Sequence, residues 1–253
     1  MKRSILLVMA AIFGAQACRQ APAHPSDTIT TRDGGELVIT FFGHGSIAFE
    51  YGGRHVYIDP VGDYADYSAL PKADLVLVGH EHGDHLDAKA IGSLRKEGTA
   101  GFGNRTAAEA WGSGEIMAHG DVRDLGWVTV EAFPAYNTSP EKQNFHPAAR
   151  AHNGWILAFG GTRVYVAGDT EDTPEMMALG ARRDEGHGID IAFLPVNLPY
   201  TMTEGQAARA VRAIGPRIFY PYHYGGTDHR TDLGRLARLI EGSGVEMRVR
   251  PLE

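Results

Sequence analysis

A short apolar run that leads into four potential metal ligands constrains the fold of this chain more than any other feature. The run Leu75–Val78 is typical of a buried strand. Shortly after it the chain reads HEHGDH, and the candidate ligands of this motif are His80, His82, Asp84 and His85. Side chains alternate along an extended chain, so the first two histidines point to the same side. The glycine lets the chain turn, so the aspartate and the last histidine can face a second ion. Imidazole and carboxylate groups suit zinc and other first-row metals, and the motif therefore predicts a two-metal centre.

A purely structural role explains this motif poorly. A single buried histidine is usually a satisfied core residue, and charged loop residues are usually solvated. Three histidines and an aspartate within six residues, directly after a buried strand, fit neither pattern.

Strand-like runs and helical patterns alternate along the rest of the chain. The chain has 253 residues, 43% of them hydrophobic, which suffices for one sizeable α/β domain. The pairs Gly52-Gly53 and Gly160-Gly161 predict hairpins, and Thr203 with Gln206 predicts a helical capping box. Strands are expected at 37–42, 47–51, 54–58, 75–78, 127–133, 155–159, 162–166, 189–194, 217–220 and 245–249, and helices at 87–97, 203–214 and 233–240. Early hairpins and later strand–helix alternation predict one αββα sandwich over residues 36–253.

The first residues are typical of an exported protein. Two basic residues precede an apolar stretch that is too short to span a bilayer, which indicates a signal peptide over residues 1–17. The only cysteine, Cys18, follows Ala15-Gln16-Ala17, which resembles a lipobox although its first two residues depart from the usual ones. We expect either a lipoprotein anchored to the membrane through Cys18 or an ordinary periplasmic protein. Residues 18–35 contain prolines and adjacent glycines and are expected to form a flexible tether.

The charge of the chain argues against a polyanionic partner. Without residues 1–17 the chain loses two basic and no acidic residues, so its formal net charge changes from −7 to −9. No run of lysines or arginines is present. We therefore expect no nucleic-acid partner, whereas the sequence predicts no oligomeric state.

Further candidate ligands lie at the ends of later strands. Residues 164–167 lead to Asp169, and residues 218–222 lead to His223. An α/β fold gathers its site at the carboxyl ends of strands. Asp169 has two carboxylate oxygens and could bridge two ions. The first ion needs one more histidine, and both His146 and His152 lie in the segment before the second hairpin.

In kind and order these elements resemble the metallo-β-lactamase superfamily. The resemblance covers nearly all of residues 36–253 and rests on the HEHGDH motif, a middle histidine, Gly168-Asp169-Thr170 and His223. Other segments are similar to a branch that contains ascorbate-6-phosphate lactonase-like and N-acyl-phosphatidylethanolamine phospholipase D-like proteins. These segments are Gly43-His44-Gly45-Ser46, Asp59-Pro60, Pro134-Ala135-Tyr136-Asn137, Tyr200-Thr201-Met202-Thr203 and Pro221-Tyr222-His223-Tyr224-Gly225.

The resemblance implies a ligand set and two divalent metal ions. Zinc is expected first, with manganese and iron as alternatives. The implied ligands are His80, His82 and His146 for one ion, and Asp84, His85 and His223 for the other, with Asp169 as the bridge. Many relatives have a histidine where this chain has Asn137. The middle ligand is therefore assigned to His146 from its His-Pro context, with His152 as the alternative.

The implied activity is hydrolysis of a small-molecule or lipid-like substrate. A metal-bound hydroxide would attack an ester, lactone or phosphodiester, and Asp84 and Asp169 are the candidate catalytic residues. The alternatives are a metal-binding module without catalysis and a hydrolase of β-lactams or thioesters. Asp59 could hold a ligand histidine through a hydrogen bond. Other side chains could line the pocket, touch substrate or simply pack, and they are His44, Asn197, Tyr200, Tyr222 and Tyr224.

Overall fold

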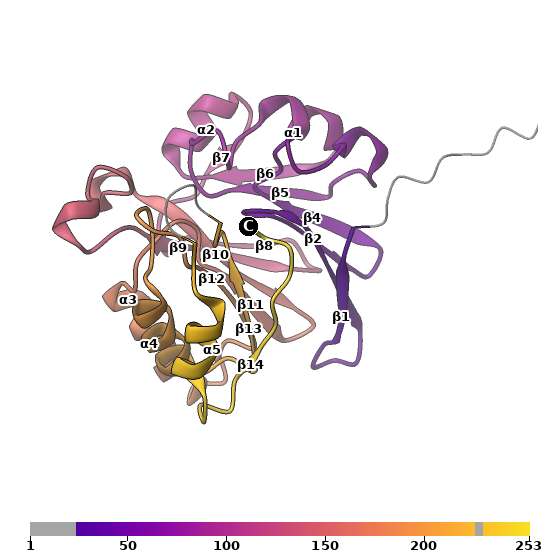
Figure 1. The fold of residues 1–253 in the computed structure, drawn as a ribbon. Helices are drawn as coiled ribbons and strands as arrows, with labels where there is room; N and C mark the ends of the chain where they lie inside the picture. Colours follow the sequence, from indigo (N-terminus) through magenta and orange to yellow (C-terminus); the bar gives the residue numbers. More distant parts are fainter. Residues whose placement is uncertain (1–23, 226–229) are drawn as a thin grey trace, which may run out of the picture.

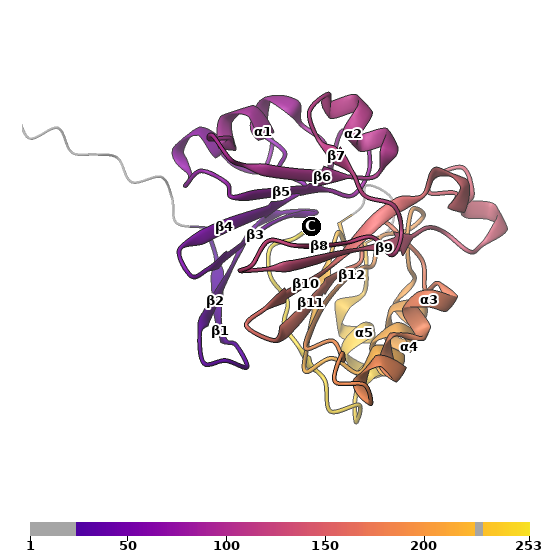
Figure 2. The same cartoon turned by 180° about the vertical axis from the view of Figure 1, so that it is seen from behind.

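A computed structural model describes residues 24–225 and 230–253 of the chain. The predicted signal peptide, Cys18 and the first part of the predicted tether lie outside these residues. Two seven-stranded sheets pack face to face, with helices on the outer face of each (Figures 1 and 2). The predicted αββα sandwich is confirmed.

The first half of the chain forms one sheet, in which sequence order and spatial order agree. Its strands are β1 (Ser26–Thr30), β2 (Glu36–Gly43), β3 (Ser46–Tyr51), β4 (Arg54–Ile58), β5 (Leu75–Val78), β6 (Ala100–Gly103) and β7 (Glu115–Ile116). The helices α1 (Ala88–Leu94) and α2 (Arg105–Trp111) cover its outer face (Figure 1). The glycine pair at 52–53 joins β3 to β4 as the predicted hairpin.

The second half forms the other sheet, in the spatial order β14-β13-β12-β11-β10-β9-β8. Its strands are β8 (Val122–Asp124), β9 (Thr129–Ala135), β10 (His152–Phe159), β11 (Thr162–Val166), β12 (Ile191–Pro195), β13 (Ile218–Tyr222) and β14 (Glu246–Met247). Its outer helices are α3 (Pro174–Met177), α4 (Glu204–Ile214) and α5 (Leu233–Ile240). The predicted capping box of α4 is present, since Thr203 and Gln206 bond to each other's backbone.

Alternation along the strands divides the core into two parts. On β2, every second side chain is buried between the sheets, including Leu37, Ile39 and Phe41. β5 is buried on both faces, because Leu75 and Leu77 face the second sheet while its other two side chains pack under α1 and α2. A parallel strand that is covered on both faces has a continuous apolar sequence, and this is why β5 can be predicted from the sequence.

For the described part of residues 18–35, the structure corrects the prediction of a flexible tether. Ser26–Thr30 forms β1, which pairs antiparallel with β2 along its whole length. Asp27 anchors this strand: its carboxylate accepts hydrogen bonds from Arg250 at 2.7 and 2.8 Å and from the Tyr220 hydroxyl. A segment fixed in this way is an edge strand of the domain.

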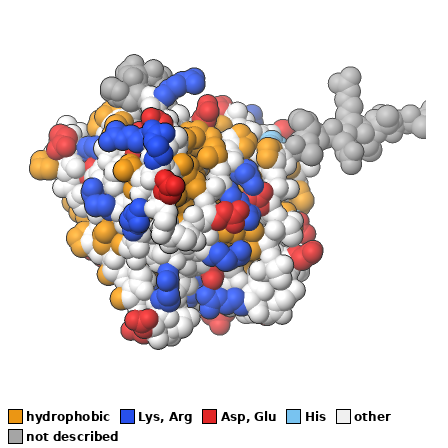
Figure 3. Space-filling view, turned by 60° about the horizontal axis from the view of Figure 1, so that its bottom comes forward, with side chains coloured by type: hydrophobic (Ala, Val, Ile, Leu, Met, Phe, Trp, Pro, Cys, Tyr) orange, Lys and Arg blue, Asp and Glu red, His pale blue; other side chains and the backbone are white. Residues whose placement is uncertain are grey.

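Several short elements were not predicted. They are β6, β7, β8, α2, α3 and four 3₁₀ turns, at Tyr67–Ala69, Pro140–Lys142, Ala148–Arg150 and Leu179–Arg183. None of the helices in the described part of the chain has the length and hydrophobicity needed to cross a membrane. On the face shown in Figure 3, acidic, basic and hydrophobic side chains are intermixed.

Candidate metal centre

The candidate ligands meet at one edge of the sandwich because of how the strands run. β5 ends shortly before His80, β11 before Asp169, and β13 before His223. β4 is parallel to β5, and β11, β12 and β13 are parallel to one another, so the carboxyl ends of these strands share an edge. His146 reaches the same place from the long loop between β9 and β10, and His44 from the turn between β2 and β3.

Left-handed backbone conformations concentrate at this edge. φ is +50° at His44, +44° at Asp59 and +48° at His223. Ala151 is the fourth non-glycine residue with positive φ in the described chain. Such conformations are costly for residues with a Cβ and persist where the surrounding structure fixes them, often at functional sites.

His80, His82 and His146 form the first group of ligand atoms. Their ligand nitrogens all lie within 4.8 Å of one another. His80 Nε2 lies 3.0 Å from His82 Nδ1. His80 and His146 are buried, whereas His82 is exposed on the wall of the site. Three converging imidazole nitrogens are a common protein ligand set for zinc.

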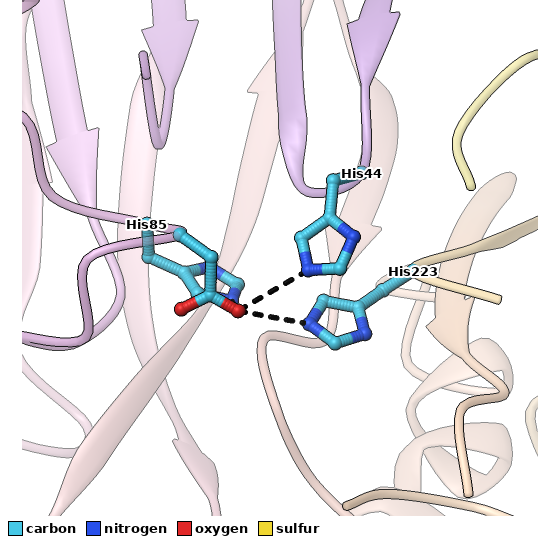
Figure 4. A group of neighbouring side chains, drawn as sticks. His44, His85 and His223 are labelled. Atoms are coloured by element: carbon cyan, nitrogen blue, oxygen red, sulfur yellow. Dashed lines mark hydrogen bonds and ion pairs between the residues drawn. The ribbon is translucent and has the colours of Figure 1, made fainter. Parts of the chain in front are cut away.

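The second group consists of His44, Asp84, His85 and His223 (Figure 4). Asp84 Oδ2 lies 3.2 Å from His44 Nε2, 3.7 Å from His223 Nε2 and 3.8 Å from His85 Nε2. The two buried histidines of the group have rings only 5.4 Å apart and nearly parallel. One carboxylate oxygen therefore faces several ring nitrogens around a shared point.

Asp169 lies between the two groups. Its Oδ2 is 3.1 Å from His146 Nε2 and 3.4 Å from His223 Nε2, and its Oδ1 is 3.5 Å from His85 Nε2. A single carboxylate thus contacts histidines of both groups, which is the arrangement that a bridging ligand requires.

Several buried polar atoms of the site have no hydrogen-bond partner in the part of the chain that the structure describes, and they test whether metal ions fit here. They include His85 Nε2, His146 Nε2, His223 Nε2 and Asp169 Oδ1, all at the centre of the site. Leaving one such atom unpaired costs about 1–3 kcal/mol. Divalent ions would coordinate these atoms together, so the donor set fits metal ions and is unfavourable without them.

Most ligands are in the protonation state that binds metal. Burial lowers the pKa of His80 well below its usual value, and burial also lowers that of His223. Burial opposes ionisation of Asp169, but the surrounding histidines outweigh it and hold the pKa of this carboxyl well below its usual range. His85 is the exception: burial would lower its pKa, but the carboxylates of Asp169 and Asp59 raise it well above 6.5. Metal must therefore displace a proton from His85.

Hydrogen bonds behind the ligands fix their orientation. Asp59 Oδ2 lies 2.8 Å from His85 Nδ1, and its Oδ1 accepts a hydrogen bond from the Gly79 N–H, also at 2.8 Å. This is the contact expected for Asp59, and it leaves Nε2 of His85 directed into the site. His146 Nδ1 lies 3.3 Å from the backbone oxygen of Tyr200, which holds that ring in the same tautomer.

Asn197 and Asn137 also support ligands, and Asn197 lines the cavity as well. The side-chain amide of Asn197 lies 3.0 Å from His223 Nδ1, and its Oδ1 has no hydrogen-bond partner among the described residues. With the amide turned so that Oδ1 accepts the Nδ1–H, Nε2 of His223 is free to bind metal. Asn137 donates its N–H to the His146 oxygen at 2.7 Å and its side-chain N–H to the Tyr200 oxygen at 2.8 Å, which fixes the loop that carries His146.

His152 is placed beside the site but outside both groups. Its ring stacks on that of His80 with centroids 4.7 Å apart, and its Nε2 lies 3.5 Å from a carboxylate oxygen of Glu81. The structure thus brings His146, not His152, among the converging ligand atoms.

A cavity of about 530 Å³ opens onto the ligands. Phe145 and Tyr200 form an edge-to-face aromatic pair in its wall, with ring centroids 4.9 Å apart. Tyr222, suggested as a substrate contact, is instead 1% exposed, packs in the core and does not line this cavity. Tyr224 is also buried, and its hydroxyl donates to the Arg250 oxygen.

A buried ion pair beneath the site was missed by the sequence analysis. Glu171 follows Asp169 by two residues, and its carboxylate lies 2.8 Å from Lys142 Nζ. The same carboxylate accepts hydrogen bonds from the N–H groups of Thr138 and Ser139 and from Gln206. It therefore ties the turn that carries Asp169 to the loop that leads to His146. Only the proximity of an acidic residue to the Gly-Asp-Thr motif hinted at this in the sequence.

The fold and the site together define a protein of the metallo-β-lactamase fold. The family model described as "Beta-lactamase superfamily domain" matches residues 38–223, and the chain belongs to this family.

The relatives and solved structures similar to this chain agree with this assignment. The "UPF0173 metal-dependent hydrolase MK1542" of Methanopyrus kandleri is 31% identical over 231 residues, which cover 85% of this chain and 96% of the relative. A solved structure from Parabacteroides distasonis, assigned as a metal-dependent hydrolase, is 46% identical with a TM-score of 0.84 and covers 91% of this chain and 100% of its own. Igni18, a metallo hydrolase from Ignicoccus hospitalis, is 27% identical with a TM-score of 0.70 and covers 86% of this chain and 96% of its own.

Proposed function

We propose that this chain hydrolyses its substrate at a centre of two divalent metal ions. The observation that carries the proposal is the meeting of two groups of ligand atoms at one carboxylate, that of Asp169. His80, His82 and His146 would hold one ion, and Asp84, His85 and His223 the other. Zinc suits a site of imidazole and carboxylate ligands best, with manganese and iron as alternatives.

The assignment of the chain as a metal-dependent hydrolase rests on the relatives as well as on the site. The chain is a metal-dependent hydrolase of the metallo-β-lactamase superfamily, the activity for which its relatives are named. When bound, a pair of divalent ions would lower the pKa of a water molecule, so that it can act as the nucleophile, and would stabilise the charge that develops on the attacked group.

The protein's own groups orient this chemistry. Asp59 and the Tyr200 oxygen direct ring nitrogens of His85 and His146 into the site, so that these two rings do not have to reorient during the reaction. Asp84 lines the cavity wall, and 44% of its side chain is exposed. It is therefore placed to accept the proton that the attacking water loses and to pass it to a leaving group.

The cavity favours a small substrate with an apolar portion. Its volume of about 530 Å³ accommodates a small molecule or one end of a lipid. The aromatic pair of Phe145 and Tyr200 offers a surface for an acyl or ring group beside the ligands. Esters, lactones and phosphodiesters are the substrate classes we propose.

A hydrolysis screen tests the proposal. The zinc-loaded protein is assayed with a phosphodiester, a lactone, a thioester and a β-lactam, each in parallel with protein stripped by a chelator. We expect turnover of at least one ester, lactone or phosphodiester that is lost on stripping and regained with zinc. Asp169→Asn is expected to abolish it. Turnover of the β-lactam alone would favour a β-lactamase, and metal binding without any turnover would favour a metal-binding module.

The location of the protein is a separate proposal. We propose that the chain is exported and that Cys18 carries the lipid that anchors it, since the only cysteine follows a signal-type apolar run. More than one acyl chain is needed for stable anchoring. A domain held in this way would meet small or lipid-like substrates at the membrane surface.

A further inference from the structure

We propose that His44 is a positioning residue, which holds the Asp84 carboxylate in place for the second metal ion through a hydrogen bond from its Nε2–H. This inference rests on the two-metal centre proposed above and adds a residue outside its seven ligands. It concerns the group drawn in Figure 4, where dashed lines join one oxygen of the Asp84 carboxylate to His44 and His223.

Asp84 needs such support more than the other ligands of the second ion. The side chains of His85, His223 and Asp169 are 0%, 3% and 3% exposed, and packing fixes them. The side chain of Asp84 is 44% exposed. Of the three histidine nitrogens that face its carboxylate, His44 Nε2 is the nearest, at 3.2 Å. A carboxylate that moves freely must be ordered when metal binds, and this lowers the affinity.

His44 is itself held rigidly. The backbone N–H of His44 donates a hydrogen bond to the backbone oxygen of Glu253 at 3.1 Å. The carboxyl-terminal segment therefore runs from the second sheet to the turn between β2 and β3 (Figure 1). The ring of His44 lies 3.6 Å from the His223 ring, measured between centroids, and stacks on Tyr64 at 5.7 Å. Only 13% of its side chain is exposed.

The glycines on either side of His44 show how tightly this turn is built. A Cβ at Gly43, where φ is +153°, would lie 2.8 Å from the Tyr64 ring. A Cβ at Gly45 would lie 3.1 Å from the His85 ring. The turn therefore packs directly on a ligand, and the left-handed conformation of His44 places its ring above Asp84. A side chain held this firmly against a loosely packed ligand is suited to orienting it.

Zinc titration of the metal-free protein against a fluorescent indicator tests the proposal without relying on activity. We compare the wild type with His44→Ala, His44→Gln and His44→Phe. The glutamine amide can place a donor near the position of Nε2, whereas phenylalanine keeps a ring but has no donor. His55→Ala, a histidine of β4 outside both ligand groups, is the matched control.

The expected result separates the hydrogen bond from packing. His44→Ala and His44→Phe should weaken one of the two zinc sites by about 10- to 100-fold, the usual effect of removing a hydrogen bond to a metal ligand. His44→Gln and His55→Ala should retain near wild-type affinity. Thermal unfolding of each metal-free variant establishes whether it folds. If His44→Ala does not fold, the zinc affinity of His44→Phe tests the role of the hydrogen bond.

Two results would overturn the inference. One is wild-type zinc affinity in a folded variant without the donor. The other is a glutamine variant as weak as the phenylalanine variant, which would make His44 a metal ligand in its own right or a packing residue. If the wild type itself binds fewer than two zinc ions, the proposed two-metal function fails instead.

Discussion

Replacing Glu171 by glutamine should destabilise the protein strongly, although this residue is not a ligand. Its carboxylate is fully buried and lies 2.8 Å from Lys142 Nζ, whose side chain is only 9% exposed. Oε2 accepts hydrogen bonds from the N–H groups of Thr138 and Ser139 at 2.8 and 2.6 Å. Glutamine keeps the shape of the side chain but removes its charge. Its NH₂ group also faces one of the two sets of donors that now bind the carboxylate oxygens.

The magnitude follows from the pKa of the carboxyl group. Burial alone would raise it, but the hydrogen bonds from Lys142, Gln206 and Ser139 outweigh burial and lower the pKa from 4.5 to about 2. At 1.36 kcal/mol per pKa unit this is about 3 kcal/mol. Breaking a buried ion pair by removing one partner costs about 3–5 kcal/mol, which counts the same interaction in another way. We expect a loss of about 2–4 kcal/mol.

Urea unfolding of the metal-free wild type and of Glu171→Gln measures this difference. Because the pKa of Glu171 is depressed in the folded state, its stabilisation is complete above its ordinary pKa of 4.5 and is lost as pH falls toward about 2. The gap between the two proteins should therefore shrink over that range. Glu109→Gln, which breaks the exposed helical pair of Arg105 and Glu109, should cost less than about 0.5 kcal/mol. A loss below about 1 kcal/mol for Glu171→Gln, or a gap that does not change with pH, would refute the reasoning.

Three further predictions concern the metal centre and the amino-terminal segment. His146→Ala should lower zinc content and activity far more than His152→Ala, as measured by elemental analysis and the hydrolysis assay; the reverse order would mean that the middle ligand is misassigned. Zinc uptake should release a proton near neutral pH, because neighbouring carboxylates, despite burial, raise the pKa of His85 above its usual value, so zinc affinity should rise with pH. Calorimetry in buffers of different ionisation enthalpy measures this, and an affinity independent of pH would contradict it. Cys18→Ser should move the protein from the membrane to the soluble fraction; mass spectrometry that finds an unmodified amino terminus at or after Cys18 would contradict lipidation.

The parts of the fold that the sequence predicted are those with local signals. β5 is apolar on both faces, two glycine pairs mark hairpins, and Thr203 with Gln206 marks the start of α4. The ligand motif after β5 is equally local, because strand, turn and ligands follow one another. The expectation that the later ligands meet there rested on a general property of parallel strands, whose carboxyl ends share an edge.

The missed parts depend on contacts between residues far apart in the sequence. β1 is polar and lies at an edge, and its partner Arg250 is 223 residues from Asp27. Three of the four residues of β6 are small, and at Gly101 a Cβ would lie 2.2 Å from the indole ring of Trp111 of α2. The pairing of Glu171 with Lys142 is of the same kind, since a charged loop residue is ordinarily solvated. Such features become visible only when the fold has brought the partners together.

Metal stoichiometry tests the central claim most directly. The metal-free protein is incubated with excess zinc, freed of unbound ions by gel filtration, and analysed for zinc per chain by elemental analysis. Two groups of ligand atoms joined at Asp169 predict two zinc ions per chain, and one or none in Asp169→Asn. A wild-type protein that retains no zinc, or a single ion at saturating zinc, would contradict the two-metal centre.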